Sequence, residues 1–294
     1  MADKRYDSTP GMLYIVATPI GNLEDITLRA LAVLGQVDLI AAEDTRWTIK
    51  LLERHQIKTR LISYHEHNEV ERTKSIVEKL RGGLSVALVS NAGTPSVSDP
   101  GFRLIREAIA NDIVLVPIPG ASAIITALSA SGLATDSFVF VGFLSKKDGK
   151  RRSQIQALEG EERTVILYES PFRILPLLKE LIEIMGDRYG VISREMTKTH
   201  EEFLRGNLSE ILENLKNRPA VKGEITLLLE KKQKDDAEAL LDVVREELRI
   251  RIAAKEETLS SIVRKTSTKY GLPKKIVYSE ALKINERLIN STTY

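Results

Sequence analysis

The sequence of 294 residues contains no cysteine, which excludes disulfide bonds, thiolate metal sites and a cysteine nucleophile. Because this absence is compatible with a reducing cytosol, we expect a cytoplasmic protein. No apolar run approaches the ~18 to 20 residues of a membrane span, so we expect no such span. Residues 1–11 are polar and lack the apolar stretch of a secretory signal, so we expect no signal there.

The chain also has little net charge. Lys and Arg number 43 and Asp and Glu number 41, which gives a formal net charge of +2. The charge of the whole chain therefore indicates no particular partner. The Walker-type phosphate-binding pattern is absent as well. A hydrophobic content of 43% over this length predicts an ordinary globular protein with two modest domains.

Short apolar runs typical of strands alternate with helical stretches. In the first half we expect strands over 13–17, 38–42, 61–64, 84–89 and 113–117, and helices over 25–35, 45–55 and 69–80. In the second half we expect strands over 138–143, 164–168, 189–193 and 224–229, and a helix over 171–185 with Pro171 in its first turn. Alternating strands and helices predict an α/β fold with a mostly parallel sheet covered by helices.

These patterns predict four parts. They are a flexible tail over 1–11, an N-terminal α/β domain over 12–120, a C-terminal α/β domain over 121–232 and a basic helical tail over 233–294. Residues 258–294 hold seven basic and two acidic side chains, a net charge of +5, and their helix, turn and helix pattern resembles a helix-turn-helix. The charge favours contact with nucleic-acid phosphate, and the alternative is a small helical cap with a solvated basic face.

Residues 90–101 are the most informative segment. They follow the expected strand over 84–89 and contain Gly93, Pro95, Pro100 and Gly101. Gly93 can adopt a positive φ or let a ligand approach the backbone, and the prolines fix φ near −65°. Because ligands bind at the carboxyl ends of strands in open α/β sheets, this loop is a predicted binding loop. Small residues and backbone amides suit a flat, adenosine-like ligand better than a triphosphate.

Polar clusters follow several other expected strands. They lie at residues 21–25, 43–47, 65–68, 168–173 and 193–202. Each cluster alone is explained by turn chemistry, helix caps or surface ion pairs. Together, so many polar clusters at strand ends favour one large shared cleft. We interpret residues 168–173 and 193–202 as junctions between a strand and a helix.

Two of these clusters leave alternatives open. Arg46 either clamps a phosphate or pairs with Asp44. His65 and His67 are two positions apart, which places both imidazoles on one face only in an extended segment. Because the sequence offers no cysteine and no obvious third ligand, we expect no metal there and favour contact with a polar substrate.

Eight motifs then occur in a fixed order. They are TPIGN at 18–22, EDTR at 43–46, SYHEHN at 63–68, AGTP at 92–95, SDPG at 98–101, PGASA at 119–123, YESP at 168–171 and REMTK at 194–198. This set resembles the tetrapyrrole methylase superfamily, and within it the branch that modifies small-subunit ribosomal RNA, over about residues 12–230. The resemblance implies an S-adenosylmethionine-dependent enzyme that methylates the ribose 2′-hydroxyl of a cytidine in 16S ribosomal RNA. It also implies two α/β domains with the cofactor in the cleft between them, and a homodimer. The implied partner is ribosomal RNA within the 30S subunit, and no membrane is implied.

The resemblance implies a set of residues that bind S-adenosylmethionine. They are Thr18, Pro19, Gly21, Ser90, Asn91, Ala92, Gly93, Thr94, Pro95, Pro119, Gly120, Ala121, Ser122, Phe143, Leu144, Gly223, Ile225 and Thr226. Two positions depart from the pattern of the family. Asn91 stands where we expect Asp, and it can still form hydrogen bonds but brings no charge. Phe172 stands where many relatives have His, so no role for a ring nitrogen carries over.

The chemistry suggests further roles. A ribose hydroxyl is a weak nucleophile at neutral pH, so a base or a cation that stabilises the alkoxide should help. We hypothesise that Lys198 lies beside the hydroxyl, as a base of depressed pKa or as a cation, and that Glu195 orients it or acts as the base. Asn22 and Asp25 complete the expected catalytic set. We assign contacts with RNA to Glu43, Asp44, Arg46, His65, His67, Tyr168, Arg173, Arg194, Lys265, Lys269, Lys274 and Lys275.

Two alternatives remain. A sister enzyme that methylates a tetrapyrrole carbon needs no basic tail and should not carry the 43–46 and 65–68 segments together. A non-enzymatic RNA-binding protein that retains the cofactor cleft would bind RNA without methyl transfer.

Overall fold

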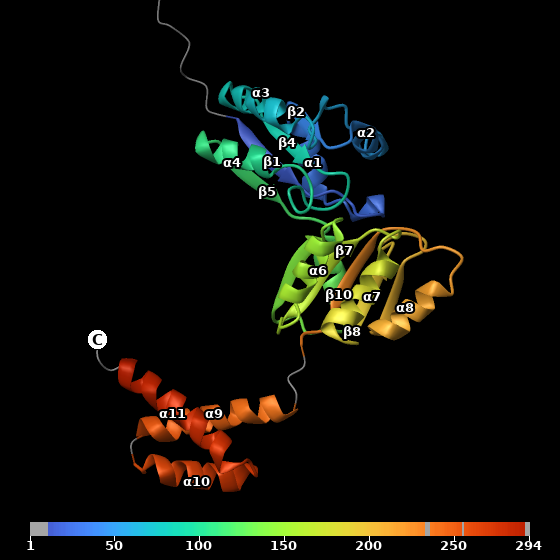
Figure 1. The fold of residues 1–294 in the computed structure, drawn as a ribbon. Helices are drawn as coiled ribbons and strands as arrows, with labels where there is room; N and C mark the ends of the chain where they lie inside the picture. The colour runs from blue at the N-terminus through green and yellow to red at the C-terminus, as the bar shows by residue number, and fades with distance from the viewer. Residues whose placement is uncertain (1–10, 233–235, 255, 292–294) are drawn as a thin grey trace, which may run out of the picture. The chain divides into compact units, whose positions relative to one another are not determined.

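The computed structural model describes residues 11–232, 236–254 and 256–291, and the chain divides into two compact units, 1–232 and 233–294 (Figure 1). The flexible tail predicted over 1–11 lies outside the described residues except for Gly11. Among the described residues, the first unit contains two five-stranded sheets and the second contains three helices.

The first sheet is entirely parallel. Its strands run in the order β3-β2-β4-β1-β5, and helices separate them along the chain. The strands are β1 (Met12–Val16), β2 (Leu39–Ala42), β3 (Leu61–Ser63), β4 (Val86–Val89) and β5 (Val114–Ile118). The helices are α1 (Leu28–Gln36), α2 (Thr45–Arg54), α3 (Glu69–Arg81) and α4 (Phe102–Ala110). The predicted strands are confirmed here, and β2 and β4 are buried throughout, as central strands of a parallel sheet should be.

The predicted helix over 25–35 is wrong at its start. A short 3-10 helix, η1 (Leu23–Asp25), comes first, and Asn22 caps it through a side-chain oxygen that accepts from the Glu24 amide. The α-helix begins after Thr27, whose hydroxyl accepts from the Ala30 amide at 3.1 Å. The cap that starts the α-helix is therefore Thr27, and Asp25 lies inside the preceding turn.

The second sheet is mixed, so the prediction of a mostly parallel sheet is wrong for this half. Its strands run in the order β6-β7-β10-β8-β9, and only the β6/β7 pair is parallel. The strands are β6 (Phe138–Phe143), β7 (Thr164–Glu169), β8 (Tyr189–Arg194), β9 (Glu202–Asn207) and β10 (Ile225–Leu229). Since β8 and β9 are antiparallel neighbours, residues 195–201 connect two strands, and the predicted junction with a helix there is also wrong.

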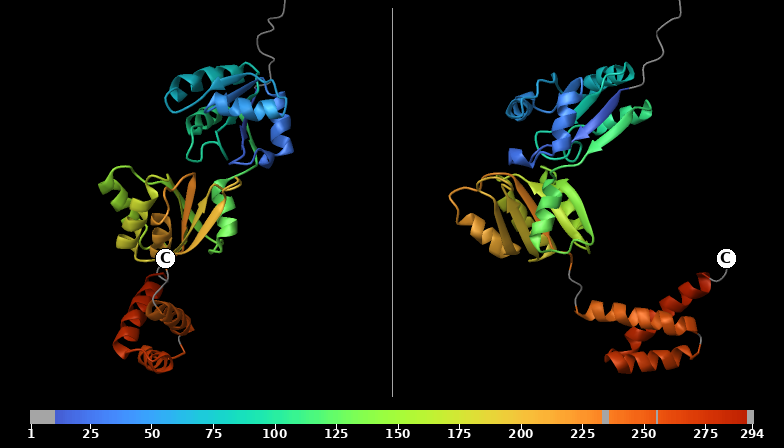
Figure 2. Two further views of the ribbon diagram at one scale, coloured as in Figure 1. Left: turned by 90° about the vertical axis from the view of Figure 1, so that its right-hand side faces the viewer. Right: turned by 180° about the vertical axis from the view of Figure 1, so that it is seen from behind.

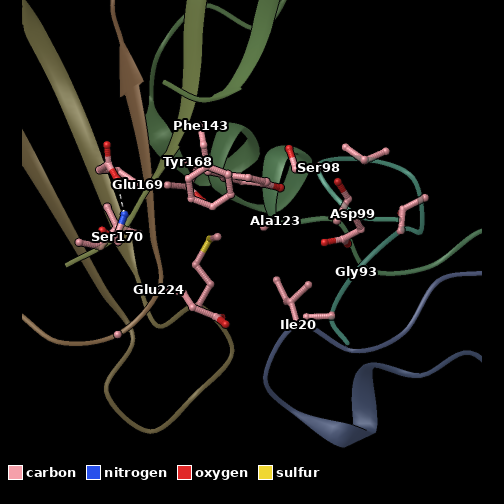
Figure 3. A pocket seen from close by; sticks show the side chains of 18 of the residues that line it. Ile20, Gly93, Ser98, Asp99, Ala123, Phe143, Tyr168, Glu169, Ser170 and Glu224 are labelled. Carbon is pink, nitrogen blue, oxygen red and sulfur yellow. Dashed lines mark hydrogen bonds between the residues drawn. The ribbon is translucent and has the colours of Figure 1, made fainter. Parts of the chain in front are cut away.

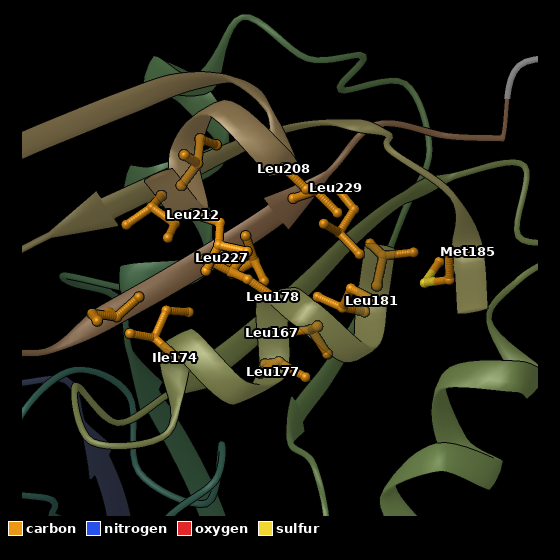
Figure 4. Packing of buried hydrophobic residues seen from close by; sticks show 14 of the residues in the cluster. Leu167, Ile174, Leu177, Leu178, Leu181, Met185, Leu208, Leu212, Leu227 and Leu229 are labelled. Carbon is orange, nitrogen blue, oxygen red and sulfur yellow. The ribbon is translucent and has the colours of Figure 1, made fainter. Parts of the chain in front are cut away.

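Helices cover the two faces of this sheet. They are α5 (Ala123–Ser131), α6 (Asp148–Ala157), α7 (Ile174–Met185) and α8 (Leu208–Lys216). Figure 4 shows leucines of α7 and α8 packed against Leu167, Leu227 and Leu229. Residues of α5 pack with Ile166, Val191 and Leu228, which alternate with those positions along the strands and so belong to the other face.

The start of α7 differs from the prediction. The α-helix begins at Ile174, and Pro171 lies in the preceding turn, where the Arg173 and Ile174 amides both donate to the Ser170 carbonyl. The first turn predicted for Pro171 is therefore part of the loop that follows β7.

The second unit is built from α9 (Asp236–Ala254), α10 (Leu259–Tyr270) and α11 (Lys274–Ser291), seen from two sides in Figure 2. Val244, Leu248, Ile262 and Val277 are among the buried residues that form its own core. Gly271, at φ +65°, ends α10, and a three-residue turn leads into α11. The prediction that this region is helical is confirmed for the described residues. None of the helices in the described part of the chain is long and apolar enough to cross a bilayer.

Candidate active site

The loops that follow β1 and β4 are joined by backbone hydrogen bonds. The Thr18 amide donates to the Gly93 carbonyl at 2.9 Å, and the Gly93 amide donates to the Thr18 carbonyl at 3.0 Å. The Thr18 hydroxyl donates to the Ser90 carbonyl at 3.1 Å. Because β1 and β4 are neighbours in the sheet, these bonds hold both loops together at its carboxyl edge.

The loop after β1 also meets the turn between β8 and β9. The Asn22 amide donates to the Thr197 hydroxyl at 2.9 Å. A methyl group on Gly21 would lie 2.6 Å from Cγ of Lys198 and from the Thr197 hydroxyl, so the approach requires glycine. In the same turn Glu195 and Thr197 adopt φ values of +51° and +66°, a strained conformation that is common at functional sites.

Residues of both sheets line one cavity of about 330 Å³ (Figure 3). This volume lies at the lower end of the ~300–1,000 Å³ of small-molecule sites. Ile20, Gly93 and Asp99 come from the loops of the first sheet, and Phe143 and Tyr168 come from the second, with ring centroids 5.6 Å apart. The remaining lining residues are Ala92, Thr94, Val97, Ser98, Ser122, Ala123, Glu169, Ser170, Pro171, Met196, Gly223, Glu224, Ile225 and Thr226.

The cavity is acidic. Asp99, Glu169 and Glu224 contribute carboxyl groups, and the described residues that line it include no Lys or Arg. Burial, and then the charge of Glu43, raises the pKa of Asp99 to about 6, so Asp99 is mainly ionised at neutral pH. Burial, followed by the charges of Asp99 and Glu224, raises the pKa of Tyr168 to about 12, which keeps its hydroxyl neutral. The site therefore favours a positively charged ligand with a flat apolar part.

Arg173 holds the wall of the cavity together. Its guanidinium lies 3.2 Å from Oε2 of the buried Glu169 and donates to the Leu144 carbonyl at 2.9 Å. The other oxygen of Glu169 accepts from the Ser170 amide at 2.7 Å. Arg173 is thus bound to protein groups, although we assigned it to RNA.

Lys198 lies between two carboxylates beside the cavity. Its Nζ is 2.8 Å from Oε1 of Glu195 and 3.0 Å from Oε2 of Glu224. Burial opposes the charge of Lys198, but hydrogen bonds to Glu195 and Glu224 outweigh it and raise its pKa. The hydrogen bond from Lys198 lowers the pKa of Glu195. A lysine that acts as a base needs a depressed pKa, whereas the pKa of Lys198 is raised. The arrangement therefore fits the alternative in which Lys198 acts as a cation.

Glu195 is itself tightly held. Its Oε1 also accepts from the Glu224 amide at 3.0 Å. A methyl group on Gly223, which has φ +90°, would lie 2.3 Å from Cγ of Glu195. Glycine at position 223 thus lets Glu195 reach both Lys198 and the start of β10.

The predicted cofactor residues fall into two groups. Those that line the cavity are Ala92, Gly93, Thr94, Ser122, Phe143, Gly223, Ile225 and Thr226. Those outside the lining are Thr18, Pro19, Gly21, Ser90, Asn91, Pro95, Pro119, Gly120, Ala121 and Leu144. Most of the second group belong to the loops that support the cavity; for example, Oδ1 of Asn91 accepts from the Asp44 amide at 3.1 Å.

Among the residues assigned to RNA, those after β2 are bound to other groups of the protein. Asp44 caps α2 and accepts two side-chain hydrogen bonds from Arg46, which lower the pKa of Asp44 to about 2. Glu43 accepts from the Asn91 amide at 3.1 Å. The structure thus forms the ion pair that we considered as the alternative for Arg46, although the Arg46 side chain is 85% exposed.

The histidines lie after β3. The side-chain nitrogen of Asn68 lies 3.2 Å from Nε2 of His65. The centroids of the His65 and His67 rings are 5.9 Å apart. Within the described residues no group of three His, Cys, Asp or Glu could hold a metal ion.

Other predicted residues lie outside the cavity lining. Arg194 is paired with Glu202 at 3.0 Å and donates to the Lys222 carbonyl. Asn22 and Asp25, which we included in the catalytic set, are exposed, and the side chain of Asn22 caps η1. Tyr168, assigned to RNA, lines the cavity instead. Phe172 is 90% exposed.

Several lining residues escaped the prediction. Ser98 and Asp99 lie in the 90–101 loop that the sequence indicated, but only its first half was assigned to the cofactor. Glu169 and Ser170 lie in a motif that was noted without being placed in the pocket. Ile20, Met196 and Ala123 carry no polar signal and could be found only from the packing of the two halves.

The comparisons with known proteins fit this geometry. The family model described as Tetrapyrrole (Corrin/Porphyrin) Methylases matches residues 12–212. The chain belongs to the tetrapyrrole methylase family. The resemblance drawn from the eight motifs is thereby confirmed.

Several proteins of this family are similar to this chain in sequence over almost its whole length. Ribosomal RNA small subunit methyltransferase I of Synechocystis is 47% identical over 277 residues, which are 93% of this chain and 98% of that protein. The proteins of the same name from Halalkalibacterium halodurans and Escherichia coli O157:H7 are 43% and 42% identical, over 92% and 94% of this chain and 94% and 96% of theirs. The chain therefore belongs to the branch of the family that bears this name.

Solved structures of tetrapyrrole methylases share the fold. Cobalt precorrin-4 methyltransferase aligns with a TM-score of 0.57 at 17% identity, over 74% of this chain and 94% of that one. Uroporphyrin-III C-methyltransferase from Thermus thermophilus, complexed with S-adenosylhomocysteine, aligns with a TM-score of 0.53 at 17% identity, over 74% and 97%. The predicted α/β fold of the tetrapyrrole methylase type, with two sheets and C-terminal helices, is confirmed.

Proposed function

We propose that this member of the family transfers a methyl group from S-adenosylmethionine to the 2′-hydroxyl of a cytidine ribose in 16S ribosomal RNA. The observation that carries the proposal is an acidic, aromatic-lined cavity with the Lys198 ammonium at its edge. The names of the relatives, which cover almost the whole chain, support a small-subunit ribosomal RNA substrate.

The lining residues fit the cofactor. S-adenosylmethionine combines a flat adenosine with a sulfonium, an ammonium and one carboxylate, so it is a net cation. Phe143, Tyr168 and Ile225 would hold the adenosine, and Asp99 and Glu224 would attract the positive groups. When bound, the cofactor supplies an electrophilic methyl group on a sulfonium.

The side chains of the protein perform the other tasks. The walls from both sheets fix the orientation of the reacting groups, which alone can supply ~7 to 11 kcal/mol. As the ribose oxygen takes the methyl group, the bond from the methyl carbon to sulfur breaks, S-adenosylhomocysteine leaves and the hydroxyl proton passes to solvent. The Lys198 ammonium stabilises the negative charge that develops on the ribose oxygen. Glu195 and Glu224 hold Lys198 in place, and the glycines at 21 and 223 allow that placement. Lys198 and Glu195 are therefore our proposed catalytic residue and its positioning residue.

The remaining parts of the proposal concern the setting. We propose that the substrate is the cytoplasmic 30S subunit, that the enzyme is a homodimer, and that residues 12–120 and 121–232 act as two domains around the cofactor. The helical unit over 233–294 is proposed to contact the RNA.

The test is methyl transfer from radiolabelled S-adenosylmethionine to three acceptors: purified small subunits, naked 16S ribosomal RNA and a tetrapyrrole precursor. We expect label on ribosomal RNA, at one position after nuclease mapping. Label on the tetrapyrrole alone would overturn the proposal in favour of carbon methylation. Binding of RNA and cofactor without transfer to any acceptor would favour a non-enzymatic role.

A further inference from the structure

The basic residues of the helical unit fall into two classes. Lys265 is 2.7 Å from Glu257, and Lys269 is 2.6 Å from Glu247. These two lysines, both predicted to contact RNA, are therefore paired with carboxylates within the unit, and Arg251 shares both carboxylates. Cations without an ion-pair partner are more readily available to an RNA phosphate.

A second set of cations surrounds a groove between α10 and α11. Arg264, Lys274 and Lys275 line a volume of about 420 Å³ together with Ser260, Val263 and Tyr278. All three cations are exposed, and none has an ion-pair partner among the described residues. The described residues that line the groove include no Asp or Glu.

The local fold explains why these side chains gather. Pro273 precedes α11, and its carbonyl accepts from the amides of Ile276 and Val277, so Lys274 and Lys275 lie in the first turn. Val263 of α10 and Val277 of α11 are buried in the shared core and fix the two helices against each other. Arg264 follows Val263 in sequence, and Tyr278 follows Val277, so both lie where the core meets solvent.

We propose that this groove binds a single-stranded or looped segment of the ribosomal RNA substrate. Arg264, Lys274 and Lys275 contact its phosphates, and Tyr278, which is 46% exposed, stacks on a base. The inference rests on the proposed RNA substrate and assigns the RNA contact of the helical unit to these four residues rather than to Lys265 and Lys269.

Two features favour single-stranded RNA over a duplex. The groove combines cations with an aromatic face, which is the usual composition of single-strand sites. In addition, sequence-specific proteins contact RNA mainly at loops and ends, where unstacked bases are accessible.

The experiment measures binding of the full-length protein to a fluorescent single-stranded RNA of roughly twelve nucleotides over a series of salt concentrations. The variant K274Q/K275Q is compared with K265Q/K269Q, which removes the same charge from the paired lysines. We expect K274Q/K275Q to weaken binding and to reduce the slope of log affinity against log salt by about 1.4, since each single-strand phosphate contact contributes ~0.7. K265Q/K269Q should leave the slope near that of the wild type.

Tyr278 tests stacking separately from charge. Tyr278→Leu should weaken binding about tenfold at constant slope, because base stacking on an aromatic ring is worth ~1 to 3 kcal/mol, and Tyr278→Phe should restore binding. Equal losses of RNA affinity in K274Q/K275Q and K265Q/K269Q, or RNA binding by K274Q/K275Q at the level of the wild type, would overturn the proposal that the groove binds RNA. Circular dichroism establishes that each variant is folded.

The same variants separate this proposal from the proposed function. If the wild-type protein methylates no ribosomal RNA but the variants bind the oligonucleotide as expected, the proposed function fails and the proposal for the groove is supported. If ribosomal RNA is methylated and K274Q/K275Q binds RNA as the wild type does, the groove alone fails.

Discussion

Replacing Lys198 by methionine removes the ammonium from the cluster with Glu195 and Glu224 and keeps most of the side-chain volume. The lysine side chain is 30% exposed, so loss of its ion pairs should lower the free energy of unfolding by only about 1 kcal/mol. Glu195 keeps its hydrogen bond from the Glu224 amide, which should preserve the local backbone. The variant should therefore fold.

The effect on catalysis should be much larger. Removing one preorganised group that stabilises developing negative charge lowers kcat by about 10²- to 10³-fold, or ~2.7 to 4 kcal/mol. Cofactor affinity should not fall, because Lys198 does not line the cavity and its removal leaves Glu224 free to attract the positive groups of the cofactor. Single-turnover methyl transfer and calorimetric titration with S-adenosylmethionine measure the two quantities separately.

Lys222→Met is a matched control. Lys222 is exposed, lies next to Gly223 and forms no side-chain ion pair with any described residue, so the same change of charge is made close to the cavity. We expect normal turnover for this variant. Wild-type turnover by Lys198→Met, or equal losses in both variants, would refute the role assigned to the ammonium.

Three further predictions follow from the structure. The pKa of Asp99 is raised to about 6, so its carboxyl becomes protonated as the pH drops from about 7 to 5, and the affinity for the cationic cofactor should fall over that range. In calorimetric titrations Asp99→Asn should bind the cofactor more weakly and without this pH dependence. Gly21→Ala forces a methyl group against Thr197 and should lower turnover about 10²-fold, whereas Gly35→Ala, where nothing lies within 4 Å of the new methyl, should leave turnover unchanged. Leu178→Ala in the fully buried core of the second sheet should lower the free energy of unfolding by ~2 to 5 kcal/mol in urea titrations, and a loss much below that range would contradict the packing described.

Local sequence patterns predicted most of the strands. A strand that is buried on both faces of its sheet has a continuous apolar run, as in β4 and β10. The patterns did not predict the helices α4, α5, α6 and α8, and they also missed β9, whose sequence EFLRGN carries charges. Glu202 and Arg205 can lie in that edge strand because Glu202 pairs with Arg194 and Arg218, and the guanidinium of Arg205 donates to the carbonyls of Ala130 and Ser131. The direction of β10 was also beyond local reasoning, since an apolar run has the same pattern in parallel and antiparallel sheets.

The site shows the same division. Gly93 and its loop were found because glycine and proline after a strand have a local meaning. Asp99 lies within the SDPG motif and Met196 within the REMTK motif, but their place in the cavity depends on how loops from two sheets meet. For Arg46 and Arg173, sequence established the charge but not its partner, and both are bound to carboxylates of the protein.

The central claim concerns the atom that is methylated. The most direct measurement is mass spectrometry of nucleosides from 16S ribosomal RNA, after undermethylated small subunits have been incubated with the protein and S-adenosylmethionine. We predict the appearance of 2′-O-methylcytidine at one position, and its loss with Lys198→Met. A methyl group on a base, or no new methylated nucleoside while the cofactor remains bound, would contradict the account.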